Sequence, residues 1–145
     1  MIYKATKLIK EELDRRDVSR DIKYAAEEFG EVSALLVEFD IDNGPTVTMQ
    51  FISTDDENDV AVYLPGIVKN IEESKVDEMM KVVNECNCAY SHIKFCMNKD
   101  HVDIEYNLPI EIGDHTVGAA ACEIFERIVS AADEVYPRFM RVIRS

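Results

Sequence analysis

The sequence predicts an α+β domain in which helices alternate with groups of antiparallel strands. Apolar residues recur at helical spacing in three segments, alternate with polar residues in the segments between them, and are separated by clusters of turn-forming residues. Strands joined by short turns pair antiparallel, because a parallel pair needs a much longer crossover. The predicted order is a helix, an antiparallel meander of three or four strands, a second helix, a strand hairpin and a long C-terminal helix.

The length and composition of the chain fit one domain. It has 145 residues, of which 47% are hydrophobic. A chain of this length can bury roughly two-thirds of its unfolded surface without disulfides or metals. The sequence contains no internal repeat, low-complexity tract or linker. We therefore expect a single domain over residues 1–145.

The N-terminal segment gives one clear element and one ambiguous element. Residues 2–16 predict an amphipathic helix, because their apolar side chains recur at helical spacing with Lys and Glu between them. Residues 21–29 are ambiguous, since their apolar positions fit a helical stripe as well as a short edge strand. Between these two alternatives we favour the strand.

The meander begins at Val32, where the apolar period changes to two, as a strand with one buried face requires. Three alternating segments follow, separated by turn residues at 42–45 and by an acidic turn at 55–59. The third segment is expected to stop at Pro65 and Gly66. The side chains expected on the buried face are Leu35, Val37, Phe39, Ile41, Val47, Met49, Phe51, Val60, Val62 and Leu64.

The second half of the chain predicts a helix, a hairpin and a long final helix. Ser74 and Asp77 resemble a capping box at the start of the second helix. The hairpin turns at residues 98–100. Asp114 is expected to cap the final helix and Pro137 to end it. The expected apolar positions of the second helix and the hairpin are Val76, Met79, Met80, Val83, Cys86, Ile93, Phe95, Met97, Val102, Ile104 and Tyr106.

Three of the four cysteines and one histidine fall within residues 83–96, which raises the question of a metal or redox site. Cys86 lies on the apolar stripe of its helix, whereas Cys88 points about 200° away at about 100° per residue. The two thiols therefore cannot hold one ion while this segment is helical. A closed zinc site also needs four converging ligands, usually as closely spaced pairs. We predict reduced, metal-free cysteines that act mostly as small core side chains.

Signatures of cofactor binding and catalysis are missing from the sequence. The five glycines are scattered, so neither a phosphate-binding loop nor a dinucleotide fingerprint can be assembled. His92, His101 and His115 fall outside any nucleophile-elbow or zinc-protease pattern. We expect no cofactor and no enzymatic activity.

Charge and hydropathy exclude two further classes of partner. Sixteen basic against 29 acidic side chains give a net charge of −13, which repels nucleic acid, and no basic stripe with interleaved aromatics offsets it. No apolar run reaches the roughly 18 residues that a membrane-spanning helix needs. The first residues lack the pattern of a secretory signal. We therefore expect a soluble cytoplasmic protein that binds neither nucleic acid nor membrane.

Two segments carry a resemblance to a known family. Residues 82–110, VVNECNCAYSHIKFCMNKDHVDIEYNLPI, combine a helix that ends in an asparagine-bearing turn, a short hairpin and a Leu-Pro step, and residues 131–137, AADEVYP, close the last helix. In this order they resemble the YbjN-like family, whose fold is similar to that of the small acidic chaperones of type III secretion. The resemblance spans nearly the whole chain. It implies a binding or regulatory module and supplies no catalytic residues.

The sequence thus predicts a non-enzymatic, chaperone-like interaction or regulatory module. We expect it to bind an unknown protein partner through an exposed sheet face or a helix groove. A modest apolar patch on the wet sheet face, which a symmetric partner could cover, also predicts a homodimer that buries on the order of 1,600 Å². These apolar positions are Ala34, Leu36, Ala61 and Tyr63. The candidate partner-binding residues are Glu38, Asp40, Tyr63, Asp103 and Glu105.

The alternative is a small-molecule-binding protein or an enzyme with an unrecognised pocket. A deep hollow in which polar groups converge would favour this alternative. A broad, shallow apolar surface would favour the partner-binding module. The polar groups that such a hollow would bring together are His92, Lys94, His101 and Glu105.

Overall fold

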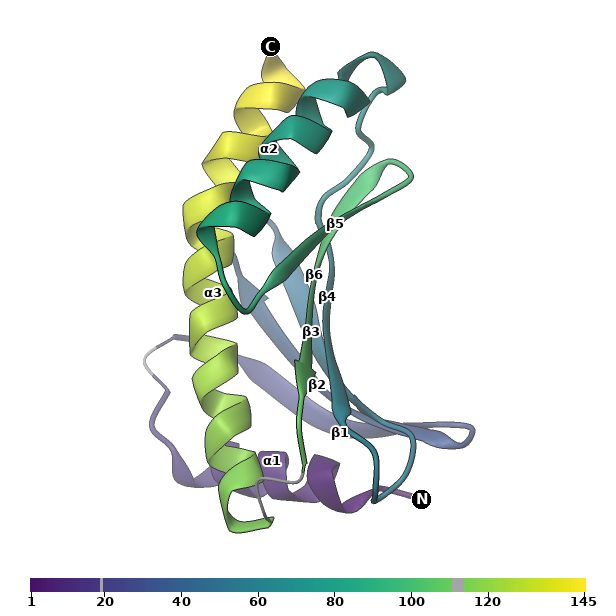
Figure 1. Ribbon diagram of the computed structural model, residues 1–145. Helices are drawn as coiled ribbons and strands as arrows, with labels where there is room; N and C mark the ends of the chain where they lie inside the picture. The colour runs from purple at the N-terminus through teal and green to yellow at the C-terminus, as the bar shows by residue number, and fades with distance from the viewer. Residues whose placement is uncertain (19, 111–113) are drawn as a thin grey trace.

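The computed structural model describes residues 1–18, 20–110 and 114–145. In these residues the helices and a single sheet form the predicted α+β fold (Figure 1). The elements, in chain order, are α1 (Lys4–Arg15), β1 (Lys23–Phe29), β2 (Val32–Asp40), β3 (Thr46–Ser53), β4 (Val60–Val68), the 3₁₀-helix η1 (Glu73–Lys75), α2 (Val76–Ala89), β5 (Lys94–Asn98), β6 (His101–Leu108) and α3 (Asp114–Arg144).

The strands form an antiparallel sheet in the order β1-β2-β3-β4-β6-β5. The first four strands are the predicted meander, and β5 with β6 is the predicted hairpin. The hairpin joins the meander through β6, so β5 lies at the outer edge. The ambiguous segment at residues 21–29 contains β1, a strand as we favoured, and all seven residues of β1 pair with β2.

The helices cover one face of the sheet and leave the opposite face without helical cover (Figure 1). Phe39 of β2 packs edge-to-face on Phe125 of α3, with ring centroids 5.7 Å apart. Phe95 of β5 packs on Phe139 of the same helix at 6.3 Å. The alternating apolar side chains of the meander fill this interface, as their period of two predicts. Those that are buried include Leu35, Val37, Phe39, Val47, Met49, Phe51, Val60, Val62 and Leu64.

Helices α1 and α3 cross closely at a glycine. A Cβ atom added to Gly118 of α3 would lie 2.9 Å from the carbonyl oxygen of Leu8 and 2.8 Å from Cβ of Glu12, both on α1. Real Cβ atoms are not found so near a backbone oxygen, so the crossing requires glycine. The contact holds α1 against the sheet, where the Thr6 and Ser33 hydroxyls form a buried hydrogen bond of 2.9 Å.

Strand β4 does not stop at Pro65 and Gly66, so that prediction is wrong. The strand continues to Val68, and its register with β6 shifts between Leu64 and Val68. Pro65 and Gly66 lie within this irregular stretch, a β-bulge, where a missing ladder hydrogen bond is tolerated. Gly66 adopts φ +63°, a conformation that glycine reaches without strain.

Two predicted helix ends are also wrong. Pro137 lies inside α3, which continues to Arg144, because the turn after the proline still buries Phe139 and Val142. Ser74 lies within η1 and makes no capping hydrogen bond to α2, which starts at Val76. The predicted cap by Asp114 involves a side chain outside the described part of the chain.

Candidate functional site

The sheet face opposite the helices has none of the described helices packed on it, and we call it the bare face. Its members are the strand residues whose side chains alternate with the buried set. They are Lys23, Ala25, Glu27 and Phe29 on β1; Val32, Ala34, Leu36, Glu38 and Asp40 on β2; Thr46, Thr48, Gln50 and Ile52 on β3; Ala61 and Tyr63 on β4; His101, Asp103, Glu105 and Asn107 on β6; and Lys94, Cys96 and Asn98 on β5.

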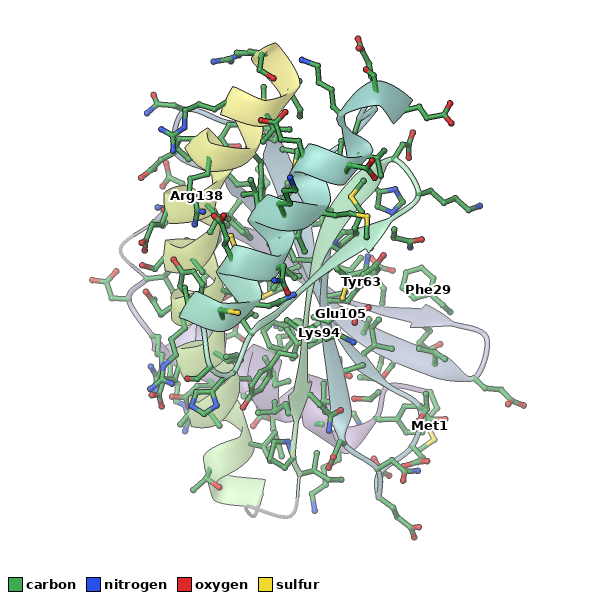
Figure 2. The ribbon with its side chains drawn as sticks, turned by 45° about the horizontal axis from the view of Figure 1, so that its top comes forward. Met1, Phe29, Tyr63, Lys94, Glu105 and Arg138 are labelled. Atoms are coloured by element: carbon green, nitrogen blue, oxygen red, sulfur yellow. The ribbon has the colours of Figure 1, made fainter. Side chains whose placement is uncertain are left out.

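A hollow of about 550 Å³ lies on the bare face over β4, β6 and β5. Ile52 and Ala61 supply apolar surface, while Lys94 and Glu105 stand directly opposite each other in the register. Tyr63, Lys94 and Glu105 lie close together over β4, β5 and β6 in Figure 2. The hollow therefore combines an apolar lining with groups of both charges. Its lining residues are Ile52, Ala61, Val62, Tyr63, His92, Lys94, Glu105, Tyr106 and Asn107.

Asp103 is a buried carboxylate beside this hollow, with 2% of its surface exposed. Its Oδ1 accepts a hydrogen bond from the backbone N–H of Gly66 at 2.8 Å, and its Oδ2 accepts one from the Tyr63 hydroxyl at 3.0 Å. His101 Nε2 lies 3.5 Å from Oδ1. The β-bulge in β4 draws the Gly66 N–H out of the ladder, and the Asp103 carboxylate satisfies it.

The structure gathers some of the predicted partner-binding residues and separates others. Tyr63, Asp103 and Glu105 are neighbours on β4 and β6. Glu38 and Asp40 are exposed on β2, separated from this group by β3. The prediction that Asp103 offers an exposed acidic side chain is wrong, because the β-bulge uses its carboxylate internally.

Three of the four polar groups named for a pocket line the hollow. They are His92, Lys94 and Glu105, whereas His101 lies instead beside Asp100 and Asp103. Sequence reasoning missed Ile52 and Asn107 as lining residues. Their alternation placed them on the correct face, but only the pairing of β4 with β6 shows that they lie together.

The apolar patch predicted on the bare face is smaller than expected. Ala34 is only 2% exposed, and Leu36 and Tyr63 are half-buried. Ala61 is exposed. All four residues lie on the predicted face, but Ala34 adds almost no exposed surface to it. The bare face is therefore a mixed surface rather than a continuous apolar one.

The four cysteines differ sharply in their surroundings. Cys86 and Cys122 are buried, Cys96 is half-buried and Cys88 is exposed. Burial, reinforced by a hydrogen bond of 3.3 Å from the Cys96 thiol to Glu105 Oε2, raises the pKa of Cys96 to about 11. Burial also raises the pKa of Cys86 and of Cys122. These three thiols therefore stay protonated near neutral pH and are poor nucleophiles.

We expect iodoacetamide to modify native protein first at Cys88, whose thiol is exposed. The thiolate is the reacting species, so Cys96 should become reactive only as the pH rises toward its raised pKa. Peptide mass spectrometry of samples quenched over time measures both rates. A Cys88→Ser variant serves as the control and should react slowly until it is unfolded. Alkylation of Cys96 as fast as Cys88 at neutral pH would contradict this picture.

Within the described ranges, no group of three or more His, Cys, Asp or Glu side chains is arranged to hold a metal ion. The cysteines there are not joined by disulfides. None of the helices in that part of the chain combines the length and apolar composition of a membrane-spanning segment. In comparisons with known proteins, no family model, curated protein or solved structure matches the chain.

Proposed function

We propose that this protein is a non-enzymatic, regulatory or chaperone-like module of the YbjN-like kind, which binds a segment of another protein on its bare face. The observation that carries the proposal is that the helices leave one whole face of the six-stranded sheet uncovered (Figure 1). That face combines half-buried apolar side chains with a hollow of about 550 Å³. Uncovered surface of this mixed composition is typical of sites that bind proteins.

The charge of the bare face indicates the chemistry of the partner. Glu38 and Asp40 are exposed near one end of β2, and Glu105 lines the hollow. The whole chain carries a net charge of −13. A basic or mixed-charge segment fits this surface best, and its attraction should weaken as salt rises.

The proposal includes a homodimer in the cytoplasm. The free cysteines support the compartment, because unpaired thiols persist in reducing surroundings. Self-association is supported by the regular edge strand β1, which has no proline or bulge and, in the described part of the chain, no strand on its outer side. In this proposal the dimer presents two bare faces to its clients.

A second candidate function is a small-molecule-binding protein or enzyme that uses the hollow. The volume of the hollow falls within the range of ligand sites, and His92, Lys94 and Glu105 line it. The Cys96 thiol beside Glu105 is protonated near neutral pH, so it would contact a ligand as a neutral side chain and would not act as a nucleophile. We favour the partner-binding module because the hollow is one part of a much larger uncovered face.

The test is client capture from the native cell by a bare-face variant, Glu38→Lys with Glu105→Lys. Asp103 is left unchanged because its carboxylate is internal. We expect the variant to lose most of the captured basic or mixed-charge proteins at low salt, because two attractive charges become repulsive. The readout is quantitative mass spectrometry of proteins retained on the immobilised chain.

The matched control is Glu11→Lys with Glu78→Lys, which makes the same change in net charge at exposed positions on α1 and α2. It should capture the same clients as the wild type. Equal capture by both variants, with both folded, would rule out the bare face as the binding surface. If the wild type captures no client at all, the small-molecule function becomes the better explanation.

A further inference from the structure

The two edge strands of the sheet, β1 and β5, differ in whether their outer main-chain groups are already hydrogen-bonded. At the β5 edge, the side chain of Asn87 on α2 pairs with the main chain of Phe95 as a neighbouring strand would. Asn87 Nδ2 donates to the Phe95 carbonyl at 2.8 Å, and the Phe95 N–H donates to Asn87 Oδ1 at 2.7 Å. The β5 edge is therefore closed to another strand at this point.

Among the described residues, the β1 edge carries charged side chains but lacks the other usual protections of an edge strand, namely a covering strand, a bulge and a proline. In the described part of the chain no strand lies outside β1. All seven of its residues pair with β2 without a bulge, and it contains no proline. Five of the seven are exposed, including Phe29, which is 56% exposed at the end of the β1–β2 hairpin (Figure 2). A regular, uncovered edge strand is a template for another strand.

The hairpin turn shows which main-chain groups of β1 are free. Phe29 and Val32 flank a two-residue turn that begins with Gly30 at φ +62°, as a type II′ turn requires. The residues that close such a turn bond each other, and bonded positions then alternate along the strand. The N–H and C=O groups of Tyr24 and Ala26 therefore point outward, away from β2.

We propose that β1 pairs antiparallel with β1 of a second copy, about a two-fold axis at Ala25, so that the two sheets become continuous. In this register Lys23 of each copy lies opposite Glu27 of the other, which gives two identical charge pairs. Tyr24 and Ala26 lie opposite each other and exchange about four main-chain hydrogen bonds in total. Ala25 meets its own symmetry mate, and its small side chain brings no clash.

Other registers fit less well. A shift of one residue would put the helix-covered face of one copy on the same side of the joined sheet as the bare face of the other. This register is excluded because residues opposite each other in a sheet point to the same side. A shift of two residues puts Lys23 opposite Phe29 and Glu27 opposite Ala25, which removes both charge pairs. Only the register centred on Ala25 is self-complementary in charge.

This inference rests on the proposed function in one respect, since it assigns a contact to the proposed homodimer. It leaves the bare face free, because strands that join edge to edge do not cover either face of the sheet. The bare faces of the two copies would instead form one surface twice as wide. Client binding and self-association can therefore be tested separately.

The first test is a charge exchange, measured by sedimentation velocity over a dilution series from micromolar to sub-millimolar concentrations. Lys23→Glu alone and Glu27→Lys alone should each weaken dimerisation about tenfold, because two opposite-charge pairs become like-charge pairs. The double variant, Lys23→Glu with Glu27→Lys, should restore the wild-type dissociation constant. A double variant as weak as either single variant would overturn the proposed register.

The second test is Ala26→Pro. Because the Ala26 N–H points outward, proline removes no bond to β2 but blocks the edge. The variant should remain folded by circular dichroism and sediment as a monomer where the wild type is a dimer. If the Ala26→Pro variant unfolds, the proposed contact is judged from the charge-exchange variants at positions 23 and 27 alone. A folded Ala26→Pro variant that still dimerises as the wild type does would overturn the proposal.

Two further outcomes separate this inference from the proposed function. A wild-type chain that stays monomeric throughout the dilution series would overturn the β1 contact, whatever the clients captured by the bare face. A monomeric wild type that loses a captured protein on Ala26→Pro would show that β1 takes a strand from another protein, which also overturns the second-copy proposal. Loss of clients from the bare-face variant with an intact dimer would support both conclusions.

Discussion

Phe95→Ala is expected to lower the free energy of unfolding by about 3–5 kcal/mol, the usual cost of emptying a fully buried phenylalanine site. Phe95 packs on Tyr90 at 5.5 Å and on Phe139 at 6.3 Å, between ring centroids. Tyr90 follows α2 and Phe139 belongs to α3, so this one ring joins β5 to both helices. The resulting cavity cannot close without moving a helix, which places the expected loss in the upper part of the usual range.

The measurement is equilibrium unfolding in urea, with the same slope required for wild type and variant. Phe29→Ala is the matched control, because it removes the same side chain from a largely exposed position. It should change the free energy of unfolding by less than about 0.5 kcal/mol in the monomer. A Phe95→Ala variant as stable as Phe29→Ala would contradict the packing described here.

Asp103→Ala is expected to cost about 2–4 kcal/mol, because it leaves two hydrogen-bond donors without an acceptor. The Gly66 N–H lies inside the β-bulge, where water cannot easily replace the carboxylate. The Tyr63 hydroxyl is the less costly loss, because Tyr63 is only half-buried and can turn toward solvent. The bulge in β4 should therefore loosen before the rest of the sheet.

A double-mutant cycle with Tyr63→Phe separates the two contributions. The coupling between positions 63 and 103 should be about 0.5–1.5 kcal/mol, and the remainder of the loss belongs to Gly66. Glu38→Ala is the control for removing a carboxylate from the bare face, and it should be nearly neutral because Glu38 is exposed. Additive effects of Asp103→Ala and Tyr63→Phe would show that their hydrogen bond contributes nothing.

Hydrophobic period alone predicted most of the fold. The period of two from Val32 onward placed β2 and β3 correctly, because one face of each strand is covered and the other is not. The helical period of residues 2–16 likewise gave α1. Pro65 and Pro137 gave the wrong element ends because proline reports only a local preference. Pro65 lies at a β-bulge, where the strand can continue without its hydrogen bond to the neighbouring strand. Helix α3 continues past Pro137 because residues beyond the proline are buried.

The sequence predicted which face of the sheet each candidate residue occupies, but not which residues from different strands lie side by side. Alternation placed Tyr63 and Glu105 on the uncovered side, yet nothing in their spacing shows that β4 pairs with β6. The unknown pairing of β4 with β6 also explains why Asp103 was wrongly expected to be exposed. A carboxylate at an alternating polar position looks exposed until the β-bulge opposite it is known to need an acceptor.

The crossing of α1 and α3 at Gly118 has a consequence for synthesis on the ribosome. Helix α1 finds one of its main packing partners in α3, which is translated only after the whole sheet and α2, so the apolar stripe of α1 stays exposed while those elements are made. Contacts between such distant segments slow folding, because a long loop must close before they form. Nascent chains of this protein should therefore be substrates for general chaperones until α3 emerges.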